Sequence, residues 1–140
     1  MSKVFVDTNI FVYSLDQSEP GKREKCRELL KFLALERNGV ISTQVMQEFY
    51  VASTGKLGAD PLVIKDILRT FERFETVVIT PVLIREAVDC AVINRLSFWD
   101  ALIIVAAESA HCEILWTEDL NHGQIIRGVR VENPFRTEGE

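Results

Sequence analysis

Short apolar runs alternate along the chain with longer segments in which apolar residues recur at helical spacing. Five runs have the character of strands, at residues 4–6, 40–41, 76–79, 113–117 and 129–131. The first of them is apolar without alternation, which is typical of a strand buried on both faces of a parallel sheet. Between the runs, apolar residues spaced three and four apart predict amphipathic helices.

The helical segments have recognisable start and stop signals. Asp60-Pro61 and Thr80-Pro81 each place a capping side chain before a proline at the first helical position, and Asn38-Gly39 ends an earlier helix. Residues 123–128 are expected to be a connection. The predicted helices cover residues 10–15, 22 to the stop at 38, 43 to 55, a segment starting at 61, 81 to about 96, and 98 to about 111.

Alternating strands and helices predict an α/β fold with three layers, α/β/α, around a central parallel sheet of about five short strands. A length of 140 residues indicates a single domain over residues 1–140 with a core of its own. Open sheets of this kind bind ligands beyond the carboxyl ends of their strands, where the strand order reverses. That edge is therefore where functional side chains are expected.

Composition adds limits to this picture. The chain is 47% hydrophobic and 26% charged, and we find no signal peptide or membrane span in it. Its three cysteines show no metal-ligand spacing, and their odd number indicates reduced thiols and a cytoplasmic protein. A net charge of −5 is not typical of a nucleic-acid-binding protein, unless bound cations neutralise some of the acids.

Asp100 opens the most apolar helix of the chain. Ser97 is a good N-cap, and residues 101–107 are apolar without a break, so this helix is expected to be buried. By itself, Asp100 fits the acid of a capping box that reaches back to the helix N-terminus. The alternative is that other acids meet it at the same place.

Three further acids can reach that place. Asp7 and Asp119 follow predicted strands, and Glu48 lies beside the apolar stripe of the helix after the second strand. Each has a local explanation as well: Asp7 can cap a helix, Glu48 can be a solvated helix residue, and Asp119 can hold an Asx turn. Because carboxyl ends of parallel strands share one edge of a sheet, we expect the four acids to come together there.

Carboxylates held close together repel one another, so they must bind protons or a cation. Oxygen ligands suit Mg²⁺ or Mn²⁺, and no set of histidines and cysteines indicates zinc. Such a site can activate water and stabilise both oxygens of an in-line displacement. The acids therefore predict metal-dependent phosphodiester hydrolysis without a protein nucleophile.

Four segments resemble, in order, the motifs of PIN-domain proteins. They are Val6-Asp7-Thr8-Asn9-Ile10-Phe11-Val12-Tyr13, Gln47-Glu48-Phe49-Tyr50, Phe98-Trp99-Asp100-Ala101-Leu102-Ile103 and Thr117-Glu118-Asp119-Leu120. The resemblance covers nearly the whole chain and is closest to the VapC-type toxins of toxin–antitoxin pairs. It implies a Mg²⁺-dependent endoribonuclease, with Mn²⁺ as a possible substitute, that acts on RNA, forms a homodimer and is inhibited by a small antitoxin.

Carried over by position, the resemblance also assigns residues. The catalytic and metal-binding acids would be Asp7, Glu48, Asp100 and Asp119, supported by Thr8, Asn9 and Thr117. It leaves the roles of Glu118 and His122 open. Trp99 and Trp116 flank apolar runs and are expected to lie in the core.

Two other functions fit parts of the pattern. A phosphatase could use Asp7 as a covalent nucleophile, although that chemistry usually needs an aspartate two positions later, where this chain has Asn9. A PIN-like fold could also act only as a scaffold that binds RNA or protein, but all four acids are present.

Overall fold

A sheet of six strands forms the middle layer of the computed structural model, which describes residues 2–136. Its strand order is β3-β2-β1-β4-β6-β5, and every neighbouring pair is parallel except β5 and β6. The strands are β1 (Val4–Val6), β2 (Gly39–Ser42), β3 (Glu75–Val77), β4 (Ile114–Trp116), β5 (Ile125–Ile126) and β6 (Val129–Glu132).

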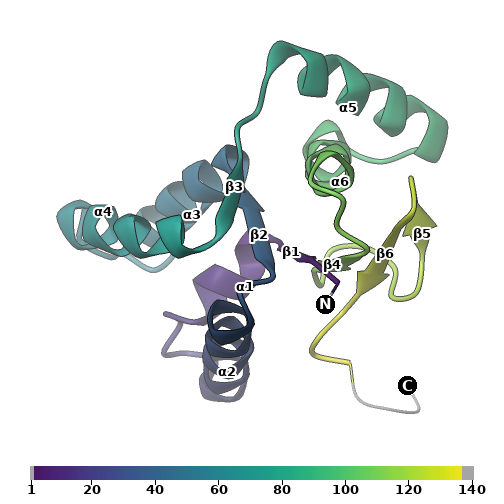
Figure 1. The fold of residues 1–140 in the computed structure, drawn as a ribbon. Coiled ribbons are helices and arrows are strands. Elements are labelled where there is room, and N and C mark those ends of the chain that lie inside the picture. Colours follow the sequence, from purple (N-terminus) through teal and green to yellow (C-terminus); the bar gives the residue numbers. More distant parts are fainter. Residues whose placement is uncertain (1, 137–140) are drawn as a thin grey trace.

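Helices cover both faces of this sheet (Figure 1). On one face α6 packs against β2, β4 and β6 and carries α5 on its outer side, and α2 packs against β2 from the other face. The predicted three-layer α/β/α architecture is therefore confirmed. The helices are α1 (Thr8–Tyr13), α2 (Pro20–Glu36), α3 (Thr43–Gly55), α4 (Pro61–Thr70), the 3₁₀ turn η1 (Phe71–Arg73), α5 (Pro81–Asn94) and α6 (Phe98–Ser109).

One strand was not expected from the sequence. Residues 123–128, predicted to be a connection, contain β5, which forms an antiparallel hairpin with β6. The two residues between these strands, Arg127 and Gly128, both have positive φ angles, 51° and 78°, as a tight hairpin turn requires. Arg-Gly is not among the common sequence signals for that turn, and two isoleucines are too short a run to show alternation.

Burial along α6 agrees with the sequence prediction except at Trp99. The seven residues from Ala101 to Ala107 are all buried between the sheet and α5, as their apolar character predicts. Trp99, expected in the core, is 61% exposed. A helix that joins parallel strands runs antiparallel to them, so the first turn of α6 lies at the carboxyl edge of the sheet instead of over it. Trp116 is only partly buried.

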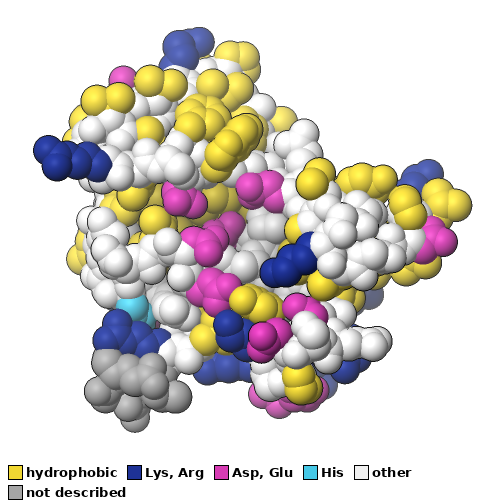
Figure 2. Space-filling model, turned by 180° about the vertical axis from the view of Figure 1, so that it is seen from behind, with side chains coloured by type: hydrophobic (Ala, Val, Ile, Leu, Met, Phe, Trp, Pro, Cys, Tyr) yellow, Lys and Arg dark blue, Asp and Glu magenta, His cyan; other side chains and the backbone are white. Residues whose placement is uncertain are grey.

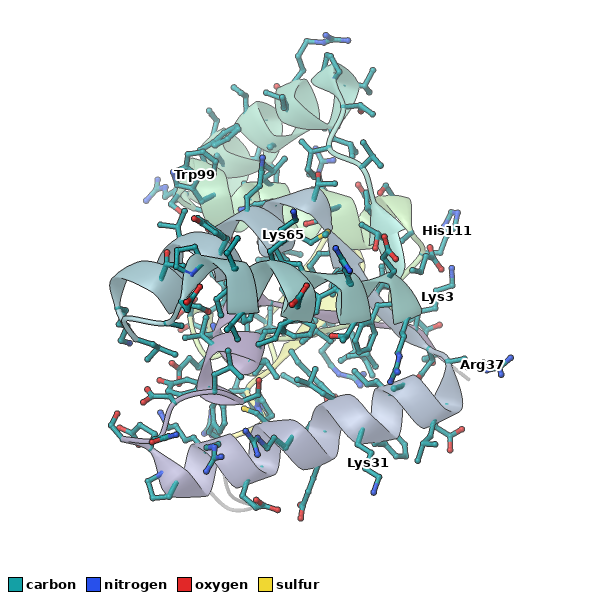
Figure 3. All side chains as sticks on the ribbon, turned by 90° about the vertical axis from the view of Figure 1, so that its left-hand side faces the viewer. Lys3, Lys31, Arg37, Lys65, Trp99 and His111 are labelled. Carbon is teal, nitrogen blue, oxygen red and sulfur yellow. The ribbon has the colours of Figure 1, made fainter. Side chains whose placement is uncertain are left out.

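Figure 3 shows the two edges of the sheet from the side. Lys3 and Arg37, which precede β1 and β2, lie on one side of the molecule with His111, which precedes β4. Trp99 lies on the other side. The carboxyl ends of the central strands therefore face the same way as the first turn of α6.

The described helices were also compared with the requirements of a membrane span. None of them is by itself long and apolar enough to cross a bilayer. Helices α5 and α6 satisfy the criteria of length and composition only when taken together, across a bend of 115°.

Candidate active site

The strand order reverses between β1 and β4. From β1 the chain moves to β2 and β3 on one side, and the later strands β4 and β6 lie on the other. Val6 pairs with Trp116, so the next residues, Asp7 and Thr117, lie beside each other at the carboxyl edge. The backbone N–H of Asp7 donates to the Trp116 carbonyl at 3.0 Å. This is the position at which sheets of this type bind ligands.

Asp7 is buried at this point, with 6% of its surface exposed. One carboxylate oxygen accepts the backbone N–H of Thr8 at 2.7 Å, and the other accepts the hydroxyl of Thr117 at 2.8 Å. Burial raises the pKa of Asp7 to about 7, and the charges of Asp119 and Glu48 add to the effect. Asp7 thus caps α1, as its local explanation predicted, and also lies among the other acids.

Asp119 is held by Asn9, in the first turn of α1. The side-chain amide of Asn9 donates to Asp119 at 3.0 Å and to the Thr117 hydroxyl at 3.4 Å. The Thr117 hydroxyl also accepts the backbone N–H of Asp119 at 3.1 Å. Burial raises the pKa of Asp119, and the charges of Asp100 and Glu118 raise it further. Asn9 and Thr117 therefore contact the acids that they were predicted to support.

Glu48 projects from α3 toward the same group. Its carboxylate accepts the hydroxyl of Thr8 at 2.9 Å, which gives the third predicted supporting residue a contact with an acid. Burial raises the pKa of Glu48, and the charges of Asp100 and Asp119 contribute. The interpretation of Glu48 as a solvated helix residue is therefore wrong, because the side chain is partly buried and hydrogen-bonded.

Asp100 lies in the first turn of α6, and the structure does not support its interpretation as the acid of a capping box. The Ser97 hydroxyl accepts the Asp100 backbone N–H at 3.1 Å, which confirms Ser97 as the N-cap. A capping box also needs a return bond from the Ser97 backbone N–H to the acid. The hydrogen bonds of residues 2–136 include no such bond, and the Asp100 side chain instead lines the cavity shared by the other acids.

The four acids line one cavity of about 650 Å³. Figure 2 shows this face of the molecule, where acidic side chains gather along a hollow with apolar side chains beside them. The apolar part of the wall comes from Val12, Val51, Ala52, Trp99 and Ile103. Lys56 is the one lysine or arginine among the described residues that line the cavity.

The donors in this cavity fit a hard divalent cation. They are carboxylate oxygens, and the pKa values of Asp7, Glu48 and Asp119 are raised by burial and by neighbouring acids, a combination that cation binding relieves. Within residues 2–136, no three histidine, cysteine or acidic side chains converge tightly enough to enclose an ion. Mg²⁺ does not require such a cage, because it keeps several waters and usually takes one or two carboxylates from the protein.

Sequence reasoning missed Gln44, which lines the cavity. Gln44 lies one helical turn before Glu48, and its amide donates to the Trp99 carbonyl at 3.1 Å and also stabilises the Glu48 carboxylate. A polar residue four positions before a candidate acid on a buried helix face is a signal that could have found it.

The open question about Glu118 now has a structural answer. Glu118 accepts the Tyr13 hydroxyl at 2.6 Å and the Lys22 ammonium at 3.2 Å, while Lys22 lies 4.6 Å from the centre of the Tyr13 ring. No local pattern links these three positions in the sequence. His122 accepts the backbone N–H of Asn133 through Nδ1 at 3.0 Å and is not among the described residues that line the cavity.

The model of one known family matches the part of the chain that forms this site. The PIN domain model matches residues 4–127, which is most of the chain and includes all four acids. The chain belongs to the PIN-domain family. A comparison of the sequence with curated proteins gives no match.

Solved structures with the same fold as this PIN domain include a chain of a toxin–antitoxin complex and a toxin. A toxin–antitoxin complex from Klebsiella pneumoniae aligns with a TM-score of 0.69 and 22% identity over 97% of this chain and 100% of that chain. VapC20 from Mycobacterium tuberculosis, described as a sarcin–ricin loop cleaving toxin, aligns with a TM-score of 0.63 and 17% identity over 84% and 92%. FitAcB from Neisseria gonorrhoeae aligns with a TM-score of 0.67 and 18% identity over 96% and 99%.

Proposed function

We propose that this PIN domain is a Mg²⁺-dependent endoribonuclease and the toxin of a toxin–antitoxin pair, with Mn²⁺ able to replace Mg²⁺. One observation carries the proposal: four acids from four segments of the chain line one cavity at the point where the strand order reverses. The structural likeness to toxins such as VapC20 supports the substrate class, because the name of that protein describes it as cleaving the sarcin–ricin loop.

In this proposal Asp7, Glu48, Asp100 and Asp119 hold the cation and are the catalytic acids. A bound divalent cation supplies a Lewis acid that lowers the pKa of water and offsets charge on the phosphate. The chain's own polar residues set the geometry: Thr117 fixes one oxygen of Asp7, and Asn9 fixes Asp119. The buried core below Asp7 keeps water from its inner side, so each interaction above it acts in a low dielectric.

The supporting residues also favour the ionised form of the acids, which is the form that binds cations. Hydrogen bonds from Thr117 and from the Thr8 backbone lower the pKa of Asp7 against the effect of burial. The Thr8 hydroxyl does the same for Glu48, and the Asn9 amide for Asp119. Loss of a supporting side chain should therefore raise the pKa of the acid that it holds and weaken cation binding.

The phosphatase alternative fits the structure less well. Asn9, where a phosphatase would have its second aspartate, is instead engaged with Asp119. No observation favours a scaffold without catalysis.

Cleavage of a defined RNA tests the proposal. Purified protein is incubated with a hairpin that contains a sarcin–ricin loop and with an unstructured RNA, in Mg²⁺, in Mn²⁺ and in EDTA. We expect cleavage of at least one RNA in either metal and none in EDTA. The Asp119→Asn variant, prepared identically, is the control for a contaminating nuclease. Cleavage that continues in excess EDTA, or at equal rate in the control, would exclude the proposed chemistry.

We also propose a small antitoxin as the partner. The acidic cavity is suited to an Arg or Lys side chain of an inhibitory peptide, since charge-assisted hydrogen bonds to carboxylates are strong. A second cavity of about 390 Å³ lies between α2 and α4, and the rings of Phe11, Phe49 and Phe71 contribute to its wall. Co-purification with the product of the neighbouring gene tests the partnership, and a complex with full nuclease activity would contradict the inhibition.

A homodimer is the oligomeric state that we propose. The outer face of α5 exposes several aliphatic side chains, among them Val82, Val88, Val92 and Ile93, which a second copy would cover. Sedimentation of the parent and of a Val92→Glu, Ile93→Glu double variant tests this, and a parent that sediments as a monomer would contradict it. The three cysteines are buried and unpaired, in keeping with the cytoplasmic setting that we propose.

A further inference from the structure

We propose that Trp99 is the platform on which one base of the substrate stacks while the adjacent phosphate lies at the four acids. The inference rests on the proposed nuclease function and adds a binding subsite to it. Its starting observation is that Trp99 is 61% exposed, on a helix in which residues 101–107 are all buried.

The position of Trp99 relative to the acids is the first argument. Trp99 directly precedes Asp100, and both residues line the same cavity with Glu48. Proteins that bind single-stranded nucleic acid hold its backbone in a groove and stack the bases on aromatic side chains there, so a phosphate at Asp100 would leave its base beside the neighbouring wall. Figure 3 shows Trp99 on the opposite side of the molecule from Lys3 and His111, which precede β1 and β4.

The second argument is that Trp99 is held in place without being covered. The ring of Phe98 contacts the indole edge to face, with centroids 5.2 Å apart and planes at 78°. The backbone carbonyl of Trp99 accepts the amide of Gln44, which is only 3% exposed and also stabilises Glu48. One buried side chain thus ties the backbone of Trp99 to Glu48, so the start of α6 keeps a fixed relation to this acid.

The third argument concerns the chemistry of the wall around it. Val51, Ala52 and Ile103 line the same cavity and make part of its wall apolar, and Lys56 supplies its one cationic side chain among the described lining residues. Apolar and aromatic surface beside a cation is the combination that binds single-stranded nucleic acid, in which the bases stack and the backbone is neutralised. An acidic peptide or a metal alone would leave this wall uncovered.

The subsite predicts a preference for unpaired nucleotides. A base inside a duplex is already stacked on its neighbours, whereas a base in a loop or a single strand can lie against an indole ring. Stacking depends little on base identity, so Trp99 should select for an accessible base and not for a particular one.

Kinetics and fluorescence test the inference together. We expect Trp99→Leu to raise KM for a short single-stranded RNA about 5- to 100-fold, with a smaller effect on kcat, and Trp99→Phe to recover most of the loss. Leu62→Ala is the matched control, since Leu62 is an apolar side chain that is 71% exposed and lies outside the cavity.

The binding measurement does not depend on cleavage. The chain has two tryptophans, so Trp116→Phe leaves Trp99 as the only indole. In this variant, combined with Asp119→Asn to prevent hydrolysis, a short oligoribonucleotide should quench the fluorescence in a saturable manner. Quenching without cleavage by the parent would support the subsite and contradict the nuclease proposal.

Two outcomes would overturn the inference. One is a Trp99→Leu variant that cleaves RNA with the KM of the parent, together with no quenching in the variant that keeps Trp99 as its only indole. This outcome would leave the nuclease proposal intact. The other is a Trp99→Leu variant that loses self-association while its RNA binding is unchanged, which would make Trp99 a contact between protein chains.

Discussion

The two walls of the cavity are built differently. The bonded wall consists of Asp7, Asn9, Thr117 and Asp119, whose side chains are joined by hydrogen bonds across β1 and β4. The open wall consists of Glu48, Trp99 and Asp100, from α3 and α6. There the Asp100 carboxylate accepts no hydrogen bond from any of the described residues, and Trp99 is largely exposed.

This difference indicates a division of tasks between the walls. A buried carboxylate without hydrogen bonds costs several kcal/mol, so the bonded wall must be satisfied internally before any ligand arrives. On the open wall, the oxygens of Asp100 and the indole of Trp99 stay available, whereas Glu48 is held by Thr8. The bonded wall therefore fixes where a cation and a phosphate lie, and the open wall supplies the groups that contact them only when they bind.

Asp100→Asn should have the largest effect on cleavage, because it removes a carboxylate that is available to a cation and breaks no hydrogen bond of the described residues. Asn keeps the size of the side chain and relieves repulsion from Glu48 and Asp119, so the cation-free variant should be as stable as the parent or slightly more stable. The Mg²⁺-dependent cleavage rate should fall by orders of magnitude. Melting temperature without metal and RNA cleavage with Mg²⁺ measure the two effects.

A conservative change at an exposed position on the same helix provides the control for Asp100→Asn. Ser109 ends the same helix away from the cavity, and Ser109→Ala should leave the cleavage rate near that of the parent. If Asp100→Asn melts far below the parent, or cleaves RNA at a similar rate, Asp100 is a structural cap and the open wall has no catalytic part.

Cation binding should have the next largest effect, on stability. Burial raises the pKa of Asp7 from 3.8 to about 7, so the native state favours the protonated form. The stability that Asp7 contributes without metal is therefore full below about pH 4 and is lost as the pH rises to about 7, by an amount on the order of a few kcal/mol. Added cation should reverse this loss, giving about 2.7 kcal/mol at 100 times its dissociation constant.

Thermal melts from about pH 4 to about pH 8, in EDTA and in Mn²⁺, measure this linkage. Asp7→Asn is the matched variant, because it cannot ionise and keeps an oxygen for the Thr8 backbone N–H. The difference in stability between parent and variant should change with pH in EDTA. A difference that is constant over this range would show that Asp7 titrates normally, and identical midpoints in EDTA and Mn²⁺ would argue against a metal site.

The sequence predicted the acids better than it predicted their surroundings. Asp7, Glu48, Asp100 and Asp119 share one cavity, as expected from strand ends meeting at one edge. That inference needed only strand order and helix spacing, which local patterns carry. The metal-binding role of these acids stays a prediction.

Trp99 shows where local patterns fail. Its position next to seven apolar residues predicted burial, but exposure depends on how far α6 extends beyond the sheet. The contact of Tyr13 with Glu118 joins positions 105 residues apart, and no spacing rule indicates it. The β5 strand was missed for a similar reason, because it is defined by pairing with β6 and not by its own two residues.

Thr117→Val tests the bonded wall, and its expected effect is of intermediate size. Valine keeps the shape of threonine but removes the hydroxyl that donates to Asp7 and accepts from the Asp119 backbone. Because Thr117 is fully buried, water cannot replace these bonds, and we expect a loss of about 1–3 kcal/mol of stability. The cleavage rate should fall less than in Asp100→Asn. Urea unfolding in EDTA measures the first effect and steady-state kinetics the second.

Thr8→Val is the comparison for Thr117→Val, since the Thr8 hydroxyl holds Glu48 on the open wall and is less buried. It should cost clearly less stability. Equal losses in the two variants would mean that the walls do not differ in internal bonding and would remove the basis of the comparison.

The smallest effect is expected for Tyr13→Phe, beside the bonded wall. The Tyr13 hydroxyl donates to Glu118 at 2.6 Å and raises the pKa of Lys22, but Lys22 also contacts Glu118 directly and lies over the ring that phenylalanine retains. The ion pair is about one third exposed on the lysine side, so water can replace the lost bond and the change in stability should stay within about 1 kcal/mol. Asp119 follows Glu118 directly, and a freed Glu118 can turn toward the cavity and raise the pKa of Asp119 further. We therefore expect the Mg²⁺ concentration that gives half-maximal cleavage to rise a few-fold, with the rate at saturating Mg²⁺ unchanged. A Mg²⁺ titration of the cleavage rate measures this, and an unchanged midpoint would show that Glu118 does not act on the cavity through Asp119.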